Sequence, residues 1–393
     1  MKKTLLAAAL LGTFAASAFA APSVTLYGRI DTGLVYSHVS ASADINNIAQ
    51  LGHFHASEDT FEMESGWSTG SRWGLKGSED IGNVKVGFVL ENGFTSDDGA
   101  DKQAGRMFGR EALVSVSGSY GTVYAGRMLS LATDGGSIGM LGEVSAFGNA
   151  YGPGATMTGS TGSAFARYDN TIAYASPTYA GFSAKAMYSF KGNSAEKDAD
   201  NNVLTENKAE STRYAAAGLQ YKAGAFTGVL TAEYTMWGNA NYGKLDDGVA
   251  VILGGNYDFG VAKAYAKATY FDNAAVYEDS FSIQELAQEE AAEEWKRPDL
   301  KFALQGWGAE IGTNVPVFGG NLLAAVGYRD AKVVEDHNVK DQRWNAALGY
   351  TYAFSKRTNV YGAASYTQEK VKGYGDSVTA KATQVGFGLV HKF

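Results

Sequence analysis

The stretch VAKAYAKATY, residues 261–270, alternates two kinds of side chain along its whole length. One set of alternate positions holds four alanines, and the other holds Lys263, Tyr265 and Lys267. A period of two with one polar face is typical of a β-strand, because successive side chains point to opposite faces. The same alternation appears in VKVGFVLENGF (84–94) and FTGVLTAEYTMW (226–237).

The lengths of the connections separate a membrane barrel from a soluble sandwich. Short turns such as 80–83 and 119–121 alternate, with hardly an exception, with long polar stretches. In an up-and-down barrel this alternation places the short turns at one rim and the long loops at the other. A sandwich would scatter its loop lengths. The long stretches are 38–65, 130–167, 191–211 and 273–299.

These segments predict an all-β fold, an antiparallel up-and-down transmembrane barrel of about 16 strands, an even number typical of outer-membrane barrels. Aromatic residues cluster near the predicted strand ends, as expected at the two membrane interfaces. The last strand should pair with the first, because an open edge in lipid leaves backbone groups unpaired. The expected strands are 24–37, 66–80, 83–94, 105–118, 121–129, 168–177, 181–190, 212–223, 226–237, 247–258, 260–272, 300–313, 320–331, 341–354, 358–370 and 379–393.

The first residues, MKKTLLAAALLGTFAASAFA (1–20), predict a secretory signal peptide. Two lysines precede a short apolar run, and Ala18-Phe19-Ala20 provides a cleavage signal. The apolar run is too short to span a membrane as a helix. We therefore expect a cleaved signal peptide at 1–20 and a barrel domain at 21–393, exported to the outer membrane.

The composition argues against several other classes of protein. The chain has 49 glycines, 23 tyrosines and 20 phenylalanines but only 5 prolines, which is too rich in aromatics and glycine for a helical enzyme. No cysteine is present, so the fold relies on no disulfide. The net charge of −8 argues against nucleic acid. No phosphate-binding loop and no nucleophile–base pair indicates an enzyme or a cofactor.

For two further features, we favour ordinary surface structure over a binding site. His53 and His55, with Glu58 and Asp59 nearby, lack the fixed spacing of a metal site, so a surface loop without metal is expected. FSIQELAQEEAAEEWKR (281–297) has helical spacing and a serine that can cap the helix. A solvated helix packed on the barrel mouth is favoured there over a ligand-binding lid.

Several stretches resemble the Gram-negative general porins, which are trimeric diffusion channels of the outer membrane. The resemblance is dense in the first half of the chain and rests on pattern in the rest. It is carried by VTLYGRIDTGL (24–34), SRWGLKGSEDIGN (71–83), GREALVSVSGSYGTVYAGR (109–127), YDNTIAYASPTYAGF (168–182) and the terminal GLVHKF.

The resemblance implies a homotrimer in contact with outer-membrane lipid and lipopolysaccharide, through which small hydrophilic solutes and ions diffuse passively. It also implies that the third long loop, 130–167, folds into the lumen and narrows it. The composition of this loop agrees, because it is glycine-rich and sparsely charged. In this loop the resemblance points to Glu143 as the acid at the constriction, and Asp134 is a second acid there.

The wall that faces this loop should be basic. Arg29 and Arg72 lie on the polar face of their strands, so parity predicts that both point inward. The resemblance adds Arg110 and Arg167. The position of Arg110 does not fit this simple pattern, because Arg110 shares its parity with the apolar residues Val114 and Val116. Arg127 and Arg106 are further candidates for the pore wall.

The sequence therefore predicts a porin with a charged constriction and a modest anion preference, set by the excess of arginines over acids. One alternative is a substrate-specific channel in which Phe147, Tyr151 and Phe165 form a sugar-stacking track. Another is a non-conducting barrel that serves as an adhesin or an anchor. The permeant solute and the conductance do not follow from the sequence.

Overall fold

The computed structural model describes residues 23–44, 53–103, 105–148, 151, 165–242, 245–274 and 303–393, without the side chain of Phe54. The predicted signal peptide 1–20 and the predicted helix 281–297 lie outside these residues. Within the described part, no helix is long and apolar enough to cross a membrane.

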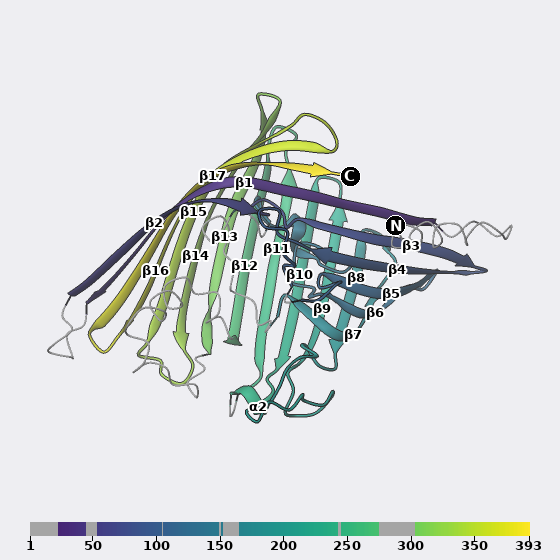
Figure 1. Cartoon of the computed structure of the whole chain (residues 1–393), viewed down its shortest axis with the longest axis horizontal. Helices are drawn as coiled ribbons and strands as arrows, with labels where there is room; N and C mark the ends of the chain where they lie inside the picture. The colour runs from purple at the N-terminus through teal and green to yellow at the C-terminus, as the bar shows by residue number, and fades with distance from the viewer. Residues whose placement is uncertain are drawn as a thin grey trace, which may run out of the picture.

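The described chain is almost entirely β-structure (Figure 1). The helical elements that it contains are short, a 3-10 turn η1 (Leu141–Glu143) and α2 (Asn239–Tyr242). The strands are β1 (Ser23–Asp44), β2 (His53–Ser65), β3 (Arg72–Ile81), β4 (Val84–Gly93), β5 (Glu111–Gly118), β6 (Gly121–Leu129), β7 (Arg167–Ala175), β8 (Phe182–Ser189), β9 (Arg213–Ala223), β10 (Phe226–Met236), β11 (Gly248–Asp258), β12 (Lys263–Ala274), β13 (Leu304–Val317), β14 (Gly320–Val333), β15 (Lys340–Ala353), β16 (Thr358–Gly373) and β17 (Asp376–Lys392).

All strand pairs are antiparallel, and the sheet closes on itself. β17 pairs with β1 from Arg29 opposite Lys392 to Asp44 opposite Ser377, and the two strands lie side by side in Figure 1. Since β2 and β3 both pair with β1, they are two parts of one barrel strand. The closed antiparallel barrel of 16 strands is thus confirmed.

The second barrel strand differs from its predicted span, 66–80. It starts already at His53 and is interrupted between Gly66 and Ser71, which is where β2 ends and β3 begins. β1 likewise continues to Asp44, so much of the predicted long loop 38–65 is a β-hairpin. At the same rim β16 and β17 are joined by a turn of two residues.

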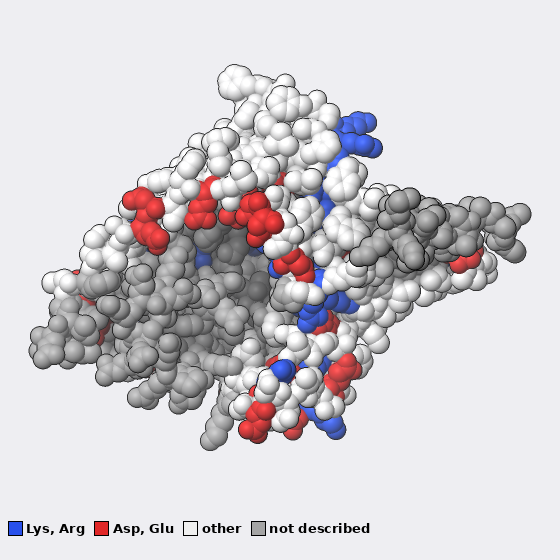
Figure 2. All heavy atoms as spheres, viewed as in Figure 1, with Lys and Arg blue, Asp and Glu red and all other residues white. Residues whose placement is uncertain are grey.

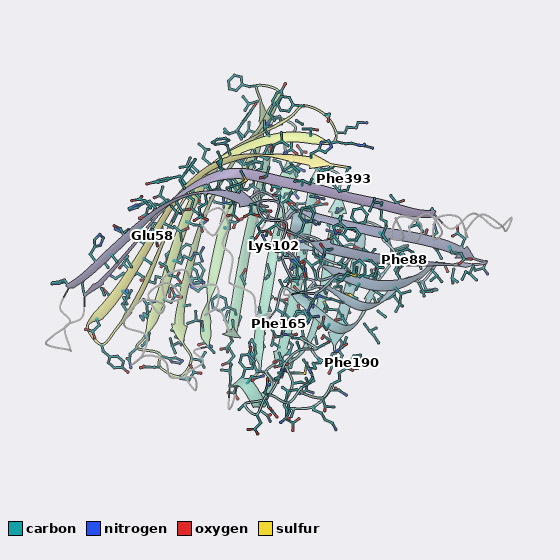
Figure 3. The ribbon with its side chains drawn as sticks, viewed as in Figure 1. Glu58, Phe88, Lys102, Phe165, Phe190 and Phe393 are labelled. Atoms are coloured by element: carbon teal, nitrogen blue, oxygen red, sulfur yellow. The ribbon has the colours of Figure 1, made fainter. Side chains whose placement is uncertain are left out.

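Alternate residues of each strand face outward and inward. On β1 the outward Leu26 and Ile30 are exposed, whereas the inward Asp31 is buried. Outward aliphatic and aromatic residues recur around the wall, as a lipid-facing surface requires. Figure 3 shows side chains on both faces of the ribbon, with Phe393 at the end of β17.

Apolar side chains on the inner face form clusters with the segment that follows β6. The larger cluster joins Leu131, Ile138 and Val144 of that segment to inward residues such as Tyr214 and Ile252. A second cluster contains Trp67, Phe147 and Tyr361. The apolar packing of this barrel therefore depends on a connecting segment that packs against the wall.

Candidate functional site on the inner wall of the barrel

Two arginines lie directly opposite each other on the first two strands of the barrel wall. Arg29 of β1 pairs in register with Arg72 of β3, and both share the inward face. Like charges directly opposite each other on a sheet are destabilising unless other groups compensate. The compensating groups here are a carboxylate and a hydroxyl, contributed by a neighbouring strand and by the interruption between β2 and β3.

The carboxylate is Glu91 of β4, which lies in the middle of the arginines. Arg110 donates from Nε to Glu91 Oε1 over 2.6 Å, and Arg72 Nη1 lies 3.7 Å from the same oxygen. Tyr27 donates from its hydroxyl to Glu91 Oε2 over 3.0 Å. One buried carboxylate thus interacts with two guanidinium groups.

Arg110 reaches this inward position although its parity is that of the outward Val114. It lies one residue before β5 begins, and its backbone N–H donates to the carbonyl oxygen of Glu91. Arg167, the first residue of β7, lies within electrostatic reach of Arg110 and Glu91. The structure therefore brings together the arginines predicted at positions 29, 72, 110 and 167.

The interruption from Gly66 to Ser71 supports this arginine cluster, defined as Arg29, Arg72, Arg110 and Arg167. Thr69 Oγ1 accepts hydrogen bonds from Arg29 at 3.1 Å and Arg72 at 3.2 Å. The backbone N–H groups of Ser68 and Thr69 donate to Asp31 Oδ2 at 2.9 and 2.6 Å. Asp31 therefore orients the arginines indirectly, by fixing the backbone that carries Thr69.

The balance of charge in the cluster is positive. Its four arginines share this part of the wall with Glu91, Glu111 and Asp31. Glu111 accepts hydrogen bonds from the backbone N–H and hydroxyl of Ser137 at 2.8 and 3.1 Å. Backbone N–H groups thus offset part of the charge of Glu111 and Asp31, which leaves the arginines in excess.

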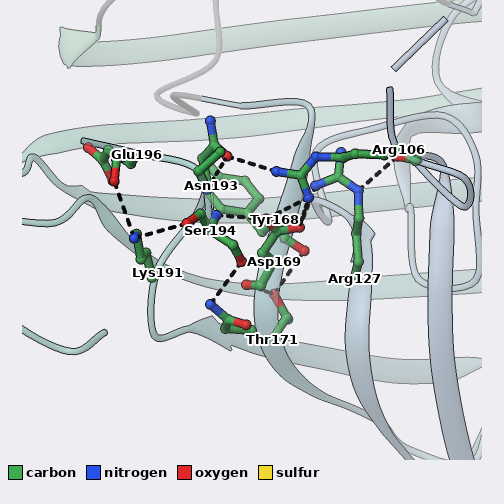
Figure 4. A network of polar contacts seen from close by, with 12 residues as sticks. Arg106, Arg127, Tyr168, Asp169, Thr171, Lys191, Asn193, Ser194 and Glu196 are labelled. Carbon is green, nitrogen blue, oxygen red and sulfur yellow. Dashed lines mark hydrogen bonds and ion pairs between the residues drawn. The ribbon is translucent and has the colours of Figure 1, made fainter. Parts of the chain in front are cut away.

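Arg106 and Arg127 bind a different carboxylate from the arginine cluster, although Arg127 also lies within electrostatic reach of Arg167. Arg127 pairs in register with Ala112 on the outward face, and both arginines bind Asp169, at 2.8 and 2.5 Å (Figure 4). Arg106 also donates to the side chain of Asn193. They join the outside of the wall to the segment after β8, and a role for either arginine at the pore wall stays a prediction.

The segment after β6, residues 130–148 and 151, contacts inward residues on many strands. Lys185 of β8 donates to the carbonyl oxygen of Ile138 over 3.0 Å. Asn256 of β11 donates to the carbonyl oxygen of Glu143 over 2.6 Å. Ser145 donates from its hydroxyl to Glu310 of β13 over 2.5 Å. We refer to these residues as the inner segment.

The two predicted acids of the inner segment, Glu143 and Asp134, lie at different places. Glu143 Oε1 lies 2.7 Å from Nζ of Lys222, at the end of β9, and both side chains are half exposed. Asp134 lies beside Gly148, where an added Cβ would come within 2.8 Å of its Oδ2. The charge of Glu143 is thus partly offset by a lysine.

The aromatic side chains of the proposed sugar track are packed into the wall. Phe147 and Tyr151 are only 4% and 5% exposed, and the ring centroid of Tyr151 lies 5.5 Å from Trp67 and 5.4 Å from Tyr361. Phe165 packs edge-on against Tyr168. Phe147 and Tyr151 are thus too deeply buried to offer a stacking surface to a solute, whereas Phe165 is only partly buried.

The sequence pattern did not single out two groups of charged residues on the inner wall. Glu91 sits on the polar face of its strand, so the same parity that identified Arg29 would have placed it inward. On the other side of the barrel, Arg329 lies 2.7 Å from Asp341 and 2.6 Å from Glu369. Arg343 lies in register between Arg329 and Glu369, so this second group is balanced in charge.

Comparisons with known proteins agree with this architecture. The profile of the Gram-negative porin family matches residues 7–372. An outer membrane porin protein of Bordetella pertussis is 36% identical over 407 residues, which cover 100% of both chains. Outer membrane porin protein 32 of Delftia acidovorans is 29% identical, again over 100% of both chains.

Solved structures of outer-membrane proteins share this fold. An anion-selective porin from Comamonas acidovorans superposes with a TM-score of 0.62 at 24% identity, covering 95% of this chain and 100% of its own. The trimer form of OmpT of Vibrio cholerae gives 0.58 at 13% identity, covering 95% and 99%. At these identities the likeness shows the fold. Together with the profile match and the full-length relatives, it shows that this chain belongs to the Gram-negative porin family and is a porin of the outer membrane.

Proposed function

We propose that ions and small hydrophilic solutes diffuse through this porin between the arginine cluster and the inner segment, with a modest preference for anions. The inner segment contacts inward residues of β8, β11 and β13, which supports a course along the inside of the wall. The arginine cluster lies on β1 and β3 and at the starts of β5 and β7. The narrowest part of the channel would then have a basic wall on one side.

The observation that carries the selectivity is the shared Glu91. A single carboxylate interacts with Arg72 and Arg110, while Arg29 is held by a neutral hydroxyl. The cluster therefore keeps positive charge that no acid within it compensates. Charges at a constriction act over a few ångströms with little screening, so they dominate the preference of a pore. Transport then requires no catalysis.

A planar lipid bilayer tests this proposal. Purified protein should give stepwise conductance, with a zero-current potential under a KCl gradient that indicates chloride preference. Swelling of liposomes in sugars of increasing size should show a size cut-off without saturation by any one sugar. Absence of conductance would contradict the channel, and saturation by one sugar would favour the substrate-specific alternative.

We further propose that residues 1–20 are cleaved and that the mature chain, 21–393, forms a homotrimer in contact with lipopolysaccharide. Small outward residues on the first strands, Gly28, Thr32 and Ala112, support a wall that meets protein rather than lipid. Thr122, expected outward as well, faces inward and donates to Ser117. A detergent-extracted, unheated sample should sediment as a trimer, and a monomer would contradict this assembly.

A further inference from the structure

Four inward glycines lie on every second strand of one side of the barrel. They are Gly218 of β9, Gly254 of β11, Gly312 of β13 and Gly349 of β15. Glycine weakens a strand and often marks a place where another part of the chain approaches closely. Their shared spacing points to one such partner for all four.

The four glycines form a regular diagonal across the sheet. Each lies two residues further along its strand than the previous one, two strands away. Gly218, for instance, is level with Ile252 of β11, and Gly254 follows two residues later. Because the strands of a barrel are tilted and staggered, such a diagonal runs around the wall.

Residues of the inner segment occupy the space above each glycine, in the order of the chain. A Cβ at Gly218 would overlap Sδ of Met140. At the other three glycines the added Cβ would lie 2.9 Å from Cβ of Val144, 3.0 Å from Cβ of Ala146 and 2.9 Å from Cε1 of Phe147, respectively. Carbon atoms in contact normally lie about 3.5–4.0 Å apart, so none of these positions has room for a larger residue.

We propose that Gly218, Gly254, Gly312 and Gly349 form a seat that holds the inner segment against the wall and thereby sets the width of the channel. The hydrogen bonds from Lys185, Asn256 and Ser145 fix the segment at intermediate points. A side chain at the seat would push the segment away from this wall, toward the arginine cluster. The location of the seat does not depend on the proposed function. The effect of the seat on channel width does rest on the proposed function.

Engineered cysteines test the location of the seat, since the chain contains no cysteine of its own. Val144→Cys combined with Gly254→Cys places two Cβ atoms 2.9 Å apart, and an outward shift of about 1 Å reaches disulfide geometry. Val144→Cys with Gly362→Cys is the control, because Gly362 lies opposite the outward Phe387. We expect oxidation to protect the first pair from maleimide labelling in the folded barrel. Labelling equal to that of the control pair would overturn the seat.

Alanine substitutions test the effect on width. At Gly254 the atoms nearest an added Cβ all belong to Val144, and at Gly349 the nearest belongs to Phe147. Gly362→Ala is the matched control, because its Cβ would meet no atom closer than 3.7 Å. We expect Gly254→Ala and Gly349→Ala to lower the single-channel conductance, the double variant to lower it further, and the control to leave it unchanged.

Variants are compared only as assembled barrels, recognised by their shifted mobility on unheated gels. Wild-type conductance, or a higher one, in all three seat variants would overturn the effect on width. If the wild-type protein itself does not conduct, the proposed function fails instead, and the cysteine pairs still decide whether the segment occupies the seat.

Discussion

Glu91 is the residue on which the charge of the arginine cluster depends. It accepts from Arg110 and Tyr27 and lies near Arg72, so its own charge is more than matched. Removal of Arg72 and Arg110 would therefore do more than remove two positive charges. It would also leave the negative charge of Glu91 without the two guanidinium groups that compensate it.

We predict that Arg72→Ser combined with Arg110→Ser moves the reversal potential toward cations and enlarges the conductance. The change leaves two arginines beside three carboxylates in this part of the wall. The measurement is the zero-current potential under a KCl gradient. Arg106→Ser is the control, because it removes a charge from the outward face while Asp169 keeps Arg127. An equal shift in the control would show that the position of the arginines is irrelevant.

Parity within a strand predicts inward residues well where the strand is regular. It places Arg29 and Arg72 on the inner face, where the structure has them. It fails where the chain leaves the strand. Arg110 precedes its strand and reaches inward against its parity, whereas Arg106 lies in the connection between β4 and β5 and binds Asp169. Neither course leaves a periodic signal in the sequence.

At the scale of the elements, a buried carboxylate supports the interruption between β2 and β3. Asp31 is buried and accepts from two backbone N–H groups and from the hydroxyl of Tyr361 at 2.7 Å. A hydrogen bond to a charged group contributes about 1.5–3 kcal/mol, and a buried donor without a partner destabilises further. The side chain of Asp31 is thus one main support of the interruption, beside backbone contacts such as that from Tyr151 N–H to the carbonyl oxygen of Trp67.

We predict that Asp31→Ala lowers the free energy of unfolding by about 3 kcal/mol. Urea unfolding in detergent, followed by tryptophan fluorescence, measures this change. Asp330→Ala is the control, because Asp330 accepts from Gln342 and Tyr328 on the outward face of β14. Its loss should change stability by less than about 1 kcal/mol. Equal effects for the two substitutions would mean that the interruption is held in another way.

The closing seam between β1 and β17 ends at Phe393. Its backbone exchanges two hydrogen bonds with Gly28, at 3.0 and 3.1 Å, and its ring occupies the space that a side chain at Gly28 would need. The two strands of this seam are the most distant in the sequence. Their pairing therefore carries the largest loop-closure entropy and is expected to form late.

We predict that deletion of Phe393 reduces the amount of assembled barrel more than it reduces the stability of barrels that do assemble. Quantification of the unheated folded band in outer membranes measures the first effect, and urea unfolding of the purified protein measures the second. Phe318→Ala, in the exposed turn after β13, is the control. Normal outer-membrane levels of the truncated chain would refute the role of the seam.

The number and order of strands were predictable because lipid imposes an apolar parity on every spanning segment. The sequence did not predict that β1 extends to Asp44 or that β2 begins at His53. In SHVSASAD (37–44) both faces carry small or polar residues, since a hairpin that projects beyond the membrane is wetted on its outer side. Without an apolar face, such a strand resembles a loop in sequence.

At the scale of the whole molecule, the overall charge and the charge of the arginine cluster have opposite signs. The chain is net acidic, and in Figure 2 acidic side chains gather along the upper edge of a hollow. Hydrogen bonds from Thr95, Asn202 and Tyr374 hold the pKa values of Asp98, Asp198 and Asp336, outside the membrane-spanning segments, below the usual range. These carboxylates therefore stay ionised at neutral pH.

The two regions differ in how strongly salt screens them. Exposed loop charges act over the Debye length, about 8 Å at physiological ionic strength and about 3 Å at 1 M. The side chains of Arg72 and Arg110 are largely buried and lie close to the proposed path of the ions, so their charges are screened less. We refer to the exposed acidic residues of the loops as the acidic vestibule. A rise in salt should therefore first weaken the attraction of cations to this vestibule and reveal the anion preference set by the arginines.

The most direct test of this account is the reversal potential of the wild-type channel, measured under KCl gradients of constant ratio at increasing mean concentration. We predict a potential that indicates anion preference and becomes more so as the mean concentration approaches about 1 M. A channel that is strongly cation-selective at about 1 M, where the vestibule is screened to about 3 Å, would contradict the placement of the arginine cluster at the constriction.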